Sequence, residues 1–427
     1  MSPMGNANRA VITGIGAIHP FGNGWETLWE NILQGKSAIR NISRFDTSCV
    51  SCPVAAEIPN FDINQYMPGR KVRKYDLCTQ FTVASLEHAI NDSGIKIDDS
   101  LRNKIGLIIG NSCGGPGIFF TEIKAFLEKG EKNIHPLAIP LTMNNNPSAV
   151  CAQLFNISGM NLTISTACSS GLNAIGMAYN MIRSGKYPVV ITGGCDAPIV
   201  PHLVAAFGSL GALAKEIEGN ISCYPFDKRR NGFVLGEGSV LMVLESLQSA
   251  INRGATIYSE VLGFASTCDV SHLVIPDSSG KEAARVMTEA LIDSMVSHEK
   301  IEYIHAHGTG TQINDVVETR AIKKVFGNRA KQILINSSKG AVGHMLGGAG
   351  ALGAAVASLV IKTGMIPPTA NLRVFDDECD LDYVPFESRM KKVEYAMVNS
   401  IGLGGNNSCL ILGSIHRKPN KKTIGVL

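Results

Sequence analysis

TISTACSSG, residues 163–171, joins a β-prone run to a run of helical periodicity. Beyond it, apolar side chains recur every three or four positions, at Leu172, Ile175, Tyr179 and Ile182. Cys168 lies at the corner, where the positive end of the helix dipole favours the thiolate over the thiol. Because the thiolate is a nucleophile, the segment predicts a strand–helix unit with a reactive cysteine at its turn. The alternative is a small buried residue, which is the common role of a single cysteine.

Short apolar runs and helical stretches alternate along the whole chain. The runs that predict buried strands are 10–15, 104–109, 161–166, 188–192, 239–244, 301–305, 332–336, 394–399 and 408–412. Stretches with helical spacing lie between them, at 80–93, 171–184, 281–294, 316–326 and 349–363. This alternation predicts an α/β fold with helices on both faces of buried sheets.

The two halves of the chain resemble each other. Each contains a strand that runs into a turn of small residues, VITGG at 190–194 and VNSIG at 398–402. Each also contains a strand followed by a helix rich in small residues, beginning near Cys168 and near Ala341. We therefore predict a duplicated architecture with one half at 1–255 and the other at 256–412. Residues 413–427 are basic and lack an apolar pattern, which predicts a frayed tail.

The composition limits the class of protein. The chain has 427 residues, of which 45% are hydrophobic and 18% charged, enough for a large buried core. Its formal charge of +3 is too small to indicate nucleic acid as a main partner. The 11 cysteines show no paired spacing, which favours reduced thiols over a disulfide framework. With no signal-like N-terminus and no apolar run of the ~20 residues that cross a bilayer, we expect a soluble, cytoplasmic protein without a membrane span.

Two motifs have interpretations that their context disfavours. GIG at 14–16 follows a strand, as dinucleotide-binding loops do, but His19 and Pro20 stand where the helix that holds the pyrophosphate would begin. His305 and His307 would lie on one face of a strand and could bind a metal, yet the segment supplies no defined third ligand. We therefore expect neither a dinucleotide nor a metal site, and a polar turn after a strand is the simpler interpretation of the histidine pair.

Two further motifs carry groups suited to chemistry. Lys339 and His344 precede a run of small and apolar residues, where burial lowers the pKa of either group unless a partner opposes it. The glycine-rich turn GLGGNN, residues 402–407, lies between two strands. Its backbone N–H groups could hold a phosphate or face developing negative charge, or the turn could be a plain hairpin. A cysteine at a helix start together with histidines is the arrangement of acyl transfer through a thioester.

Five segments occur in the order found in β-ketoacyl-ACP synthases. They are TACSSG at 166–171, PFDKRRNGFVLGEG at 225–238, AHGTGT at 306–311, Lys339 with Gly343-His344, and GLGG at 402–405. The sequence resembles β-ketoacyl-ACP synthase II and the related type II polyketide ketosynthases over residues 10–412. The resemblance implies a thiolase fold, in which two similar α/β halves form a five-layer αβαβα stack. It also implies a dimer, either a homodimer or a heterodimer with a chain-length-factor-like subunit.

The resemblance implies the reaction as well. Cys168 would take an acyl group from acyl carrier protein (ACP) as a thioester. Malonyl-ACP would then lose CO₂, and its carbanion would attack the thioester in a Claisen condensation that gives 3-oxoacyl-ACP. His307 and His344 match the pair that holds the malonyl thioester carbonyl, where they would stabilise enolate charge as hydrogen-bond donors. Lys339 matches a lysine that pairs with the position of Glu318 and orients the site, and it is not the base.

Other parts of the site take their expected roles from the same resemblance. Asp315, Thr309 and Thr311 would support the catalytic residues. The backbone N–H groups of Cys168 and Leu403 would form the oxyanion hole. No metal or cofactor is expected, because the 4′-phosphopantetheine arm is carried by the ACP substrate.

Substrate and carrier contacts are also implied by the resemblance. The acyl pocket and its gate would be formed by Cys113, Phe207, Ile401 and Leu403. The carrier protein would meet a basic run, mainly through charge steering, at Arg70, Lys71, Arg73 and Lys74. A further basic carrier contact of the family reads as Gly211 here, so that contact is missing.

Three departures from the family's pattern bear on the substrate. Ile401 and Leu403 stand where synthase II commonly has phenylalanines, one of them a gate. Cys113 stands where a bulkier aliphatic residue often limits the acyl pocket. Gly353 replaces a glutamate, as in polyketide ketosynthases. Since smaller side chains leave more room, we hypothesise a specialised polyketide or polyene ketosynthase that accepts an unusual acyl chain.

Two other functions remain open from the sequence. A non-catalytic chain-length-factor subunit shares the fold but lacks the nucleophile, whereas this chain keeps Cys168, both histidines and Lys339. A biosynthetic thiolase or an initiating synthase uses acyl-CoA at a Cys-His-Asn or Cys-His-Cys site. Two histidines with a lysine favour condensation with malonyl-ACP instead.

Overall fold

The apolar runs of the first half form strands that are buried, apart from the edge strand. The structure is a computed structural model, and it describes residues 9–66 and 74–415. In chain order the strands are β1 (Ala10–His19), β5 (Ile105–Asn111), β6 (Asn161–Ile164), β7 (Val189–Asp196) and β8 (Gly238–Ser246). They lie side by side in the order β1-β8-β7-β5-β6. β5 is parallel to β6 and β7, whereas β8 is antiparallel to both β7 and β1.

The second half repeats this arrangement strand for strand. Its strands are β9 (Ser259–Cys268), β10 (Tyr303–His305), β11 (Leu334–Asn336), β14 (Tyr395–Ile401) and β15 (Asn406–Gly413). They lie in the order β9-β15-β14-β10-β11. β10 is parallel to β11 and β14, whereas β15 is antiparallel to β14 and β9. Because strand order and direction match position by position, the predicted duplication is confirmed, while its boundary at residue 255 stays a prediction.

β1 and β9 join the two halves. They pair antiparallel, with Ala10 opposite Val261. The result is one continuous 11-stranded sheet, which includes the short strand β2 (Gly22–Asn23) beside β1. β9 was not predicted from the sequence, because Glu260 and Gly263 interrupt its apolar run.

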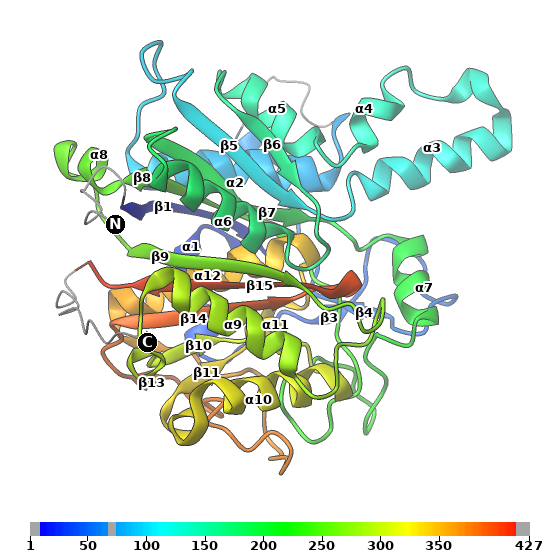
Figure 1. Ribbon diagram of the computed structural model, residues 1–427. Coiled ribbons are helices and arrows are strands. Elements are labelled where there is room, and N and C mark those ends of the chain that lie inside the picture. The colour runs from blue at the N-terminus through cyan, green and yellow to red at the C-terminus, as the bar shows by residue number, and fades with distance from the viewer. Residues whose placement is uncertain (1–8, 67–73, 416–427) are drawn as a thin grey trace.

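Helices cover both outer faces and fill the space between the two half-sheets. α2 (Leu77–Ser93) and α5 (Asn146–Leu154) pack on the first half-sheet from outside. α9 (Lys281–Ser294) packs on the second half-sheet from outside, with α10 (Gln312–Phe326) beside it. α6 (Ser170–Arg183) and α12 (Ala349–Thr363) pack against each other in the middle. Figure 1 shows the resulting succession of helix, sheet, helix, sheet and helix, which is the five-layer stack that the resemblance implies.

The middle helices are apolar because they lie in the core. The segment Leu346–Thr363 is the one helix in the described part of the chain that is long and apolar enough to cross a membrane, and 83% of it is buried inside the protein. Small residues let α12 approach α6 closely, since a Cβ atom at Gly350 would come 2.8 Å from the Cβ atom of Leu172. The core accounts for the hydrophobicity of this helix.

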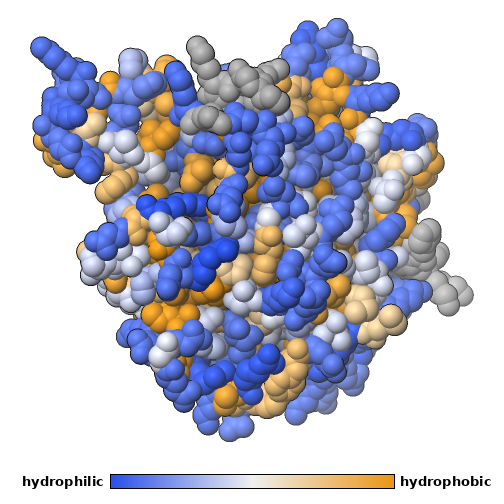
Figure 2. Space-filling model, turned by 180° about the vertical axis from the view of Figure 1, so that it is seen from behind, coloured by the Kyte–Doolittle hydropathy of each residue, from blue (hydrophilic) through white to orange (hydrophobic). Residues whose placement is uncertain are grey.

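The remaining elements lie at the edges and in the connections. They are α1 (Trp25–Leu33), β3 (Arg40–Asn41), β4 (Val54–Ala55), α3 (Pro116–Lys129), α4 (Ala138–Thr142), α7 (Pro201–Ser209), α8 (Leu247–Asn252), α11 (Lys339–Val342), β12 (Met365–Ile366) and β13 (Arg389–Met390). α3 and α4 project from the body (Figure 1). Seen from behind, much of the surface is hydrophilic, with separate apolar patches (Figure 2). Most of the expected tail, 416–427, lies outside the described residues.

Candidate active site

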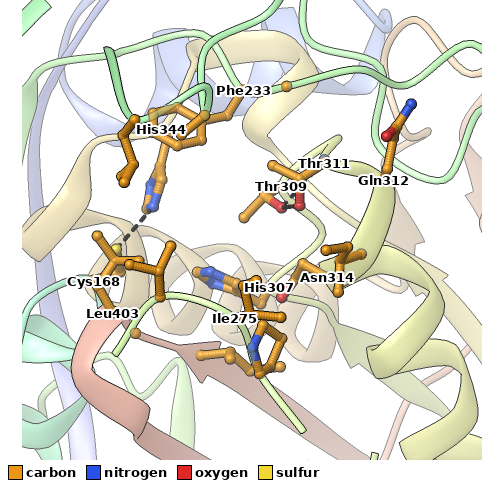
Figure 3. A pocket seen from close by; sticks show the side chains of 18 of the residues that line it. Cys168, Phe233, Ile275, His307, Thr309, Thr311, Gln312, Asn314, His344 and Leu403 are labelled. Atoms are coloured by element: carbon orange, nitrogen blue, oxygen red, sulfur yellow. Dashed lines mark hydrogen bonds between the residues drawn. The ribbon is translucent and has the colours of Figure 1, made fainter. Parts of the chain in front are cut away.

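One pocket brings together residues from both halves of the chain. Its volume is about 490 Å³. Its walls include Cys168 from the first half and His307, His344 and Leu403 from the second. Figure 3 shows the thiol of Cys168 and the rings of both histidines around the same space. The cysteine and the two histidines singled out in the sequence therefore meet in one cavity.

Cys168 lies at the turn between β6 and α6, as the sequence predicts. The preceding residue, Ala167, has a φ of 52°, a left-handed conformation that is uncommon for a residue with a side chain. The hydroxyl of Ser400 donates a hydrogen bond to the carbonyl oxygen of Cys168 at 3.0 Å. The turn is thus fixed against the end of β14, and the buried thiol borders the pocket.

His344 faces the thiol from the loop after α11. Its Nε2 atom lies 3.1 Å from the Sγ atom of Cys168. Its backbone N–H donates to the carbonyl of Val234 at 2.7 Å, and its carbonyl accepts from the N–H of Gly236 at 3.0 Å. The ring of Phe233 packs edge-on against the imidazole, with centroids 5.3 Å apart. These contacts hold the ring in place, and its Nδ1 atom has no hydrogen-bond partner among the residues described.

His307 lies across the pocket, just after β10. Its ring centroid is 5.5 Å from that of His344. Glu318, on α10, accepts hydrogen bonds from the backbone N–H groups of His307 and Gly308, each at 2.8 Å. The ammonium group of Lys339 donates to the carbonyl oxygen of His307 and lies 3.4 Å from its Nδ1 atom. Both charged side chains therefore act on the same short segment of backbone.

The expected pairing of Lys339 with Glu318 is indirect. Although the structure describes both residues, it records no ion pair between them, because each binds a different backbone group of His307. Burial lowers the pKa of Lys339, and the negative charge of Glu318 opposes that shift from a distance. The two residues orient His307 together without touching each other.

The loop beyond His307 is held by Asp315. The carboxylate accepts hydrogen bonds from the backbone N–H groups of Thr309 at 3.0 Å and Gly310 at 3.1 Å. The hydroxyl oxygens of Thr309 and Thr311 are 2.8 Å apart, and both threonines line the pocket. Asp315 thus supports the loop from outside the pocket, whereas the two threonines face into it (Figure 3).

The glycine-rich turn between β14 and β15 lies beside the thiol. The backbone N–H groups of Leu403 and of Cys168 itself both act on the sulfur and favour its negative charge. The N–H of Gly404 donates to the carbonyl of Leu273 at 2.7 Å, so the turn is tied to the loop that follows β9. Of the three interpretations of this motif, N–H groups that face developing negative charge fit this geometry best.

Burial has a larger effect on the Cys168 thiol than the favourable groups around it. Burial raises the pKa of Cys168 to about 11, against the opposing effects of the Leu403 N–H and the charge of Lys339. Burial therefore outweighs the effect expected of the helix start, and the thiol keeps its proton at neutral pH. Reaction requires a transfer of that proton, and the Nε2 atom of His344 is in contact to receive it.

Both histidines are uncharged at neutral pH. Burial lowers the pKa values of His307 and His344 well below the usual range, and the charge of Lys339 lowers them further. A neutral imidazole has one nitrogen that donates and one that accepts. Two neutral rings at one pocket can therefore donate to the same developing oxyanion while adding no positive charge of their own.

The residues expected at the acyl pocket and its gate fall into two groups. Phe207, Ile401 and Leu403 line the pocket. Cys113 does not line it, but packs in the apolar cluster that contains Cys168 and Phe207. A change at Cys113 would therefore act through the packing behind Cys168.

Gly353 does not enlarge the pocket, contrary to expectation. It lies on α12 against His305, and a Cβ atom at Gly353 would come 2.7 Å from the Nδ1 atom of that histidine. Neither residue lines the pocket. The absent side chain makes room for His305, so the argument for a roomier gate rests on Ile401 and Leu403.

Only part of the basic run predicted to meet the carrier protein lies within the described residues. Lys74 is exposed just before α2. Arg70, Lys71 and Arg73 lie outside the described residues. Gly211 lines the pocket and supplies no charge. The basic run stays a prediction.

The two disfavoured motifs have structural explanations. Gly16 lets β1 pack against α2, because a Cβ atom there would come 2.0 Å from the carbonyl oxygen of Ser85. β1 continues to His19, so no helix follows the glycines. His305 lies outside the pocket lining, with its Nε2 atom 3.0 Å from the hydroxyl of Ser338. Within the described ranges, no three His, Cys, Asp or Glu side chains are grouped in a way that could hold a metal ion.

Two parts of the site were not predicted from the sequence. The segment between β9 and α9 contributes a stretch of wall, made of Asp269, His272, Val274, Ile275 and Pro276. It was missed because β9 itself was not predicted. Asp196 ends β7 and binds backbone near the pocket. A carboxylate at the end of an apolar strand was the available signal for it.

Comparison with known proteins places the chain among condensing enzymes. Two family models match it, the N-terminal domain of β-ketoacyl synthase over residues 7–250 and the C-terminal domain over residues 258–373. The 3-oxoacyl-[acyl-carrier-protein] synthase 2 of Synechocystis is 40% identical over 403 residues, which cover 94% of this chain and 97% of the relative.

Solved structures agree in fold over nearly the whole chain. The ishigamide ketosynthase/chain length factor is 34% identical with a TM-score of 0.90, covering 96% of this chain and 99% of the other. A type II polyketide synthase acyl-carrier protein in complex with its ketosynthase bound to the hexaketide includes a chain that is 29% identical with a TM-score of 0.86, covering 96% and 100%. Together with the family models, this similarity shows that the chain belongs to the β-ketoacyl synthase family.

Proposed function

We propose that this protein is a β-ketoacyl-ACP synthase that extends an acyl chain held on Cys168 by decarboxylating condensation with malonyl-ACP. The family and the type II relatives support the reaction class. The observation that carries the proposal is the contact of Cys168 with His344 in a pocket that His307 also lines.

In the first half-reaction, Cys168 takes the acyl group from acyl-ACP. The sulfur attacks the thioester carbonyl, the bond to the carrier's pantetheine sulfur breaks, and the thiol proton passes to the departing sulfur. His344, 3.1 Å from the thiol, is placed to accept and relay that proton. The N–H groups of Cys168 and Leu403, which act on the sulfur, are placed to stabilise the negative charge on the tetrahedral intermediate.

In the second half-reaction, malonyl-ACP loses CO₂, and the electrons of the broken carbon–carbon bond form an enolate of the carrier thioester. Neutral His307 and His344, each with its proton on Nε2, donate hydrogen bonds to the enolate oxygen, so His344 here takes the other tautomer from the one that accepts the thiol proton. The α-carbon attacks the acyl carbonyl, the Cys168 thiolate leaves, and it takes up a proton from solvent to restore the thiol. Lys339 binds the carbonyl of His307 and is a positioning residue, not the base.

Intact-mass measurement tests this assignment. The wild-type protein should gain one acyl group with acyl-ACP and lose it, with release of 3-oxoacyl-ACP, when malonyl-ACP is added. Cys168→Ala should gain none. Cys151→Ala is the matched control, because Cys151 is also buried and lies outside the pocket. Acylation of another cysteine, or condensation by Cys168→Ala, would overturn the proposal.

The carrier partner is proposed to be ACP, which brings the 4′-phosphopantetheine, so the enzyme needs no cofactor of its own. A similar solved structure is a ketosynthase in complex with its acyl-carrier protein. Exposed Lys74 belongs to the basic run proposed to meet the carrier. Lys74→Glu should lower kcat/KM for acyl-ACP at low salt while leaving acyl-pantetheine turnover unchanged, because rim charges steer encounter.

A dimer is proposed through the edge at β6. Its residues, Asn161–Ile164, contain no charge and no proline, and Leu162 is 40% exposed. Large apolar side chains of the α3–α4 region are exposed as well, including Phe126 and Ile139. The partner is a second copy or a chain-length-factor-like subunit. Light scattering of wild type and of Leu162→Lys tests the edge, and dimerisation only with a coexpressed subunit identifies the heterodimer.

The acyl substrate is proposed to be an unusual chain of a polyketide or polyene pathway in the cytoplasm. Support comes from Ile401 and Leu403, which line the pocket where larger aromatic residues are common in synthase II. Acylation rates with a panel of acyl-ACPs test this. A strict preference for saturated medium chains would contradict it.

A further inference from the structure

Asp196 ends β7 next to the pocket without lining it. Its side chain is fully buried, and no step proposed above uses it. One carboxylate oxygen accepts hydrogen bonds from the side-chain amide of Asn111 at 3.1 Å and the N–H of Cys113 at 3.0 Å. The other accepts from the N–H of Gly347 at 2.6 Å and from the hydroxyl of Ser112. The carboxylate therefore ties together two segments that are far apart in the chain.

Both of these segments touch the start of α6. Gly110 directly precedes the bound 111–113 turn, and a Cβ atom there would come 2.3 Å from the backbone nitrogen of Gly171. A Cβ atom at Gly171 would in turn come 2.5 Å from the carbonyl oxygen of Gly347. Cys168 lies just before Gly171, and His344 lies just before Gly347. The carboxylate thus links the segment that contains Cys168 to the segment that contains His344.

We propose that Asp196 is a positioning residue for the condensation: by binding the 111–113 turn and Gly347 at once, it sets the placement of Cys168 relative to His344. The inference rests on the roles proposed above for these two residues. An asparagine in this place would turn its NH₂ group toward backbone N–H donors, because an amide has only one acceptor oxygen. Either the 111–113 turn or Gly347 would then lose its partner and move.

The charge of Asp196 has a second, opposite effect. Burial raises the pKa of Asp196 to about 6, so the carboxylate is charged at alkaline pH. Its charge adds to the burial that raises the Cys168 pKa, whereas the charge of Lys339 lowers it. Loss of the charge should therefore ease ionisation of the thiol while the loss of hydrogen bonds disturbs its placement. General damage to the fold would lower activity without also making the thiol ionise at lower pH.

The experiment compares Asp196→Asn, Asp196→Glu and the control Asp92→Asn. Asp92 is half-buried and accepts hydrogen bonds from Trp25 and Tyr258 away from the pocket. Asp92→Asn therefore also removes a hydrogen-bonded carboxylate, but at a place that does not touch the site. We measure condensation kcat per active site, with sites counted by intact mass after iodoacetamide modification of Cys168. We also measure the pH midpoint of that modification.

Asp196→Asn should lower kcat per site at least about tenfold, leave KM for acyl-ACP within about twofold, and move the alkylation midpoint to lower pH. Asp196→Glu keeps the charge, so it should keep the midpoint and recover part of kcat; it also provides a measurement if the amide variant does not fold. Asp92→Asn should match wild type per site. Wild-type kcat per site in Asp196→Asn, or an unmoved midpoint, overturns the inference. A wild-type enzyme without condensation would instead refute the proposed function.

Discussion

The Nε2 atom of His344 lies 3.1 Å from the Sγ atom of Cys168, although 176 positions separate the two residues in the chain. The duplication explains how they meet. β6 and β11 occupy the same place in the two half-sheets, and the chain passes from each of them into one of the paired middle helices, α6 and α12. Cys168 and His344 both lie on these passages. Since the two helices pack against each other, their approaches reach one pocket.

Replacing each histidine separately should slow a different half-reaction. His344→Ala should slow acylation by about 10²-fold, because this ring touches the thiol that must lose its proton. His307→Ala should leave acylation within a few-fold but lower decarboxylation of malonyl-ACP by about 10²–10³-fold. Intact mass reports acylation and CO₂ release reports decarboxylation. Equal slowing of acylation in both variants would contradict the distinct roles.

Alkylation of Cys168 should keep rising far into the alkaline range. Because burial raises the pKa of Cys168 to about 11, only a small fraction is thiolate at neutral pH. That fraction grows about tenfold per pH unit below the pKa. The rate of inactivation by iodoacetamide, followed from about pH 7 to pH 9, measures it. A plateau in this range would show a thiolate in the free enzyme and rule out the raised pKa.

Replacement of Lys339 by methionine should shift the pH midpoint of Cys168 alkylation to higher pH, which is opposite to the shift expected for Asp196→Asn. The positive charge of Lys339 lowers the Cys168 pKa, so its loss should raise the midpoint of alkylation. The buried carbonyl of His307 would also lose its ammonium donor, which costs about 1–3 kcal/mol in the free energy of unfolding. Denaturant unfolding measures the second effect. Lys96→Met, at an exposed lysine, is the control and should change neither quantity.

Much of the fold follows from the sequence for a simple reason. β5 and β7 are buried along their whole length, and strands of that kind read as uninterrupted apolar runs. β9 is only partly buried and includes Glu260, so its run is broken and it escaped prediction. The loop that it leads into, with His272, escaped with it.

The chemical state of the site could not be predicted in the same way. The helix start after Cys168 is visible in the sequence, but the burial that raises its pKa comes from distant segments that pack around it. The extra pocket space expected at Gly353 is not there for a related reason. The sequence shows that a side chain is missing, but it does not show which neighbouring side chain fills the gap. Here the neighbour is His305.

Two glycines with similar φ angles test whether the 402–405 turn places the Leu403 N–H. Gly405 has a φ of 77° and Gly185 a φ of 73°. Alanine should strain either position by about 1–2 kcal/mol. A Cβ atom at Gly405 would come 1.9 Å from the carbonyl oxygen of Asp269, whereas no atom of the described residues lies within 4 Å of one at Gly185. Gly405→Ala should therefore shift the turn, withdraw the Leu403 N–H from the thiol and slow acylation at least about tenfold. Gly185→Ala should acylate like wild type in the same intact-mass time course. Wild-type acylation by Gly405→Ala would show that the reaction does not depend on the position of this turn.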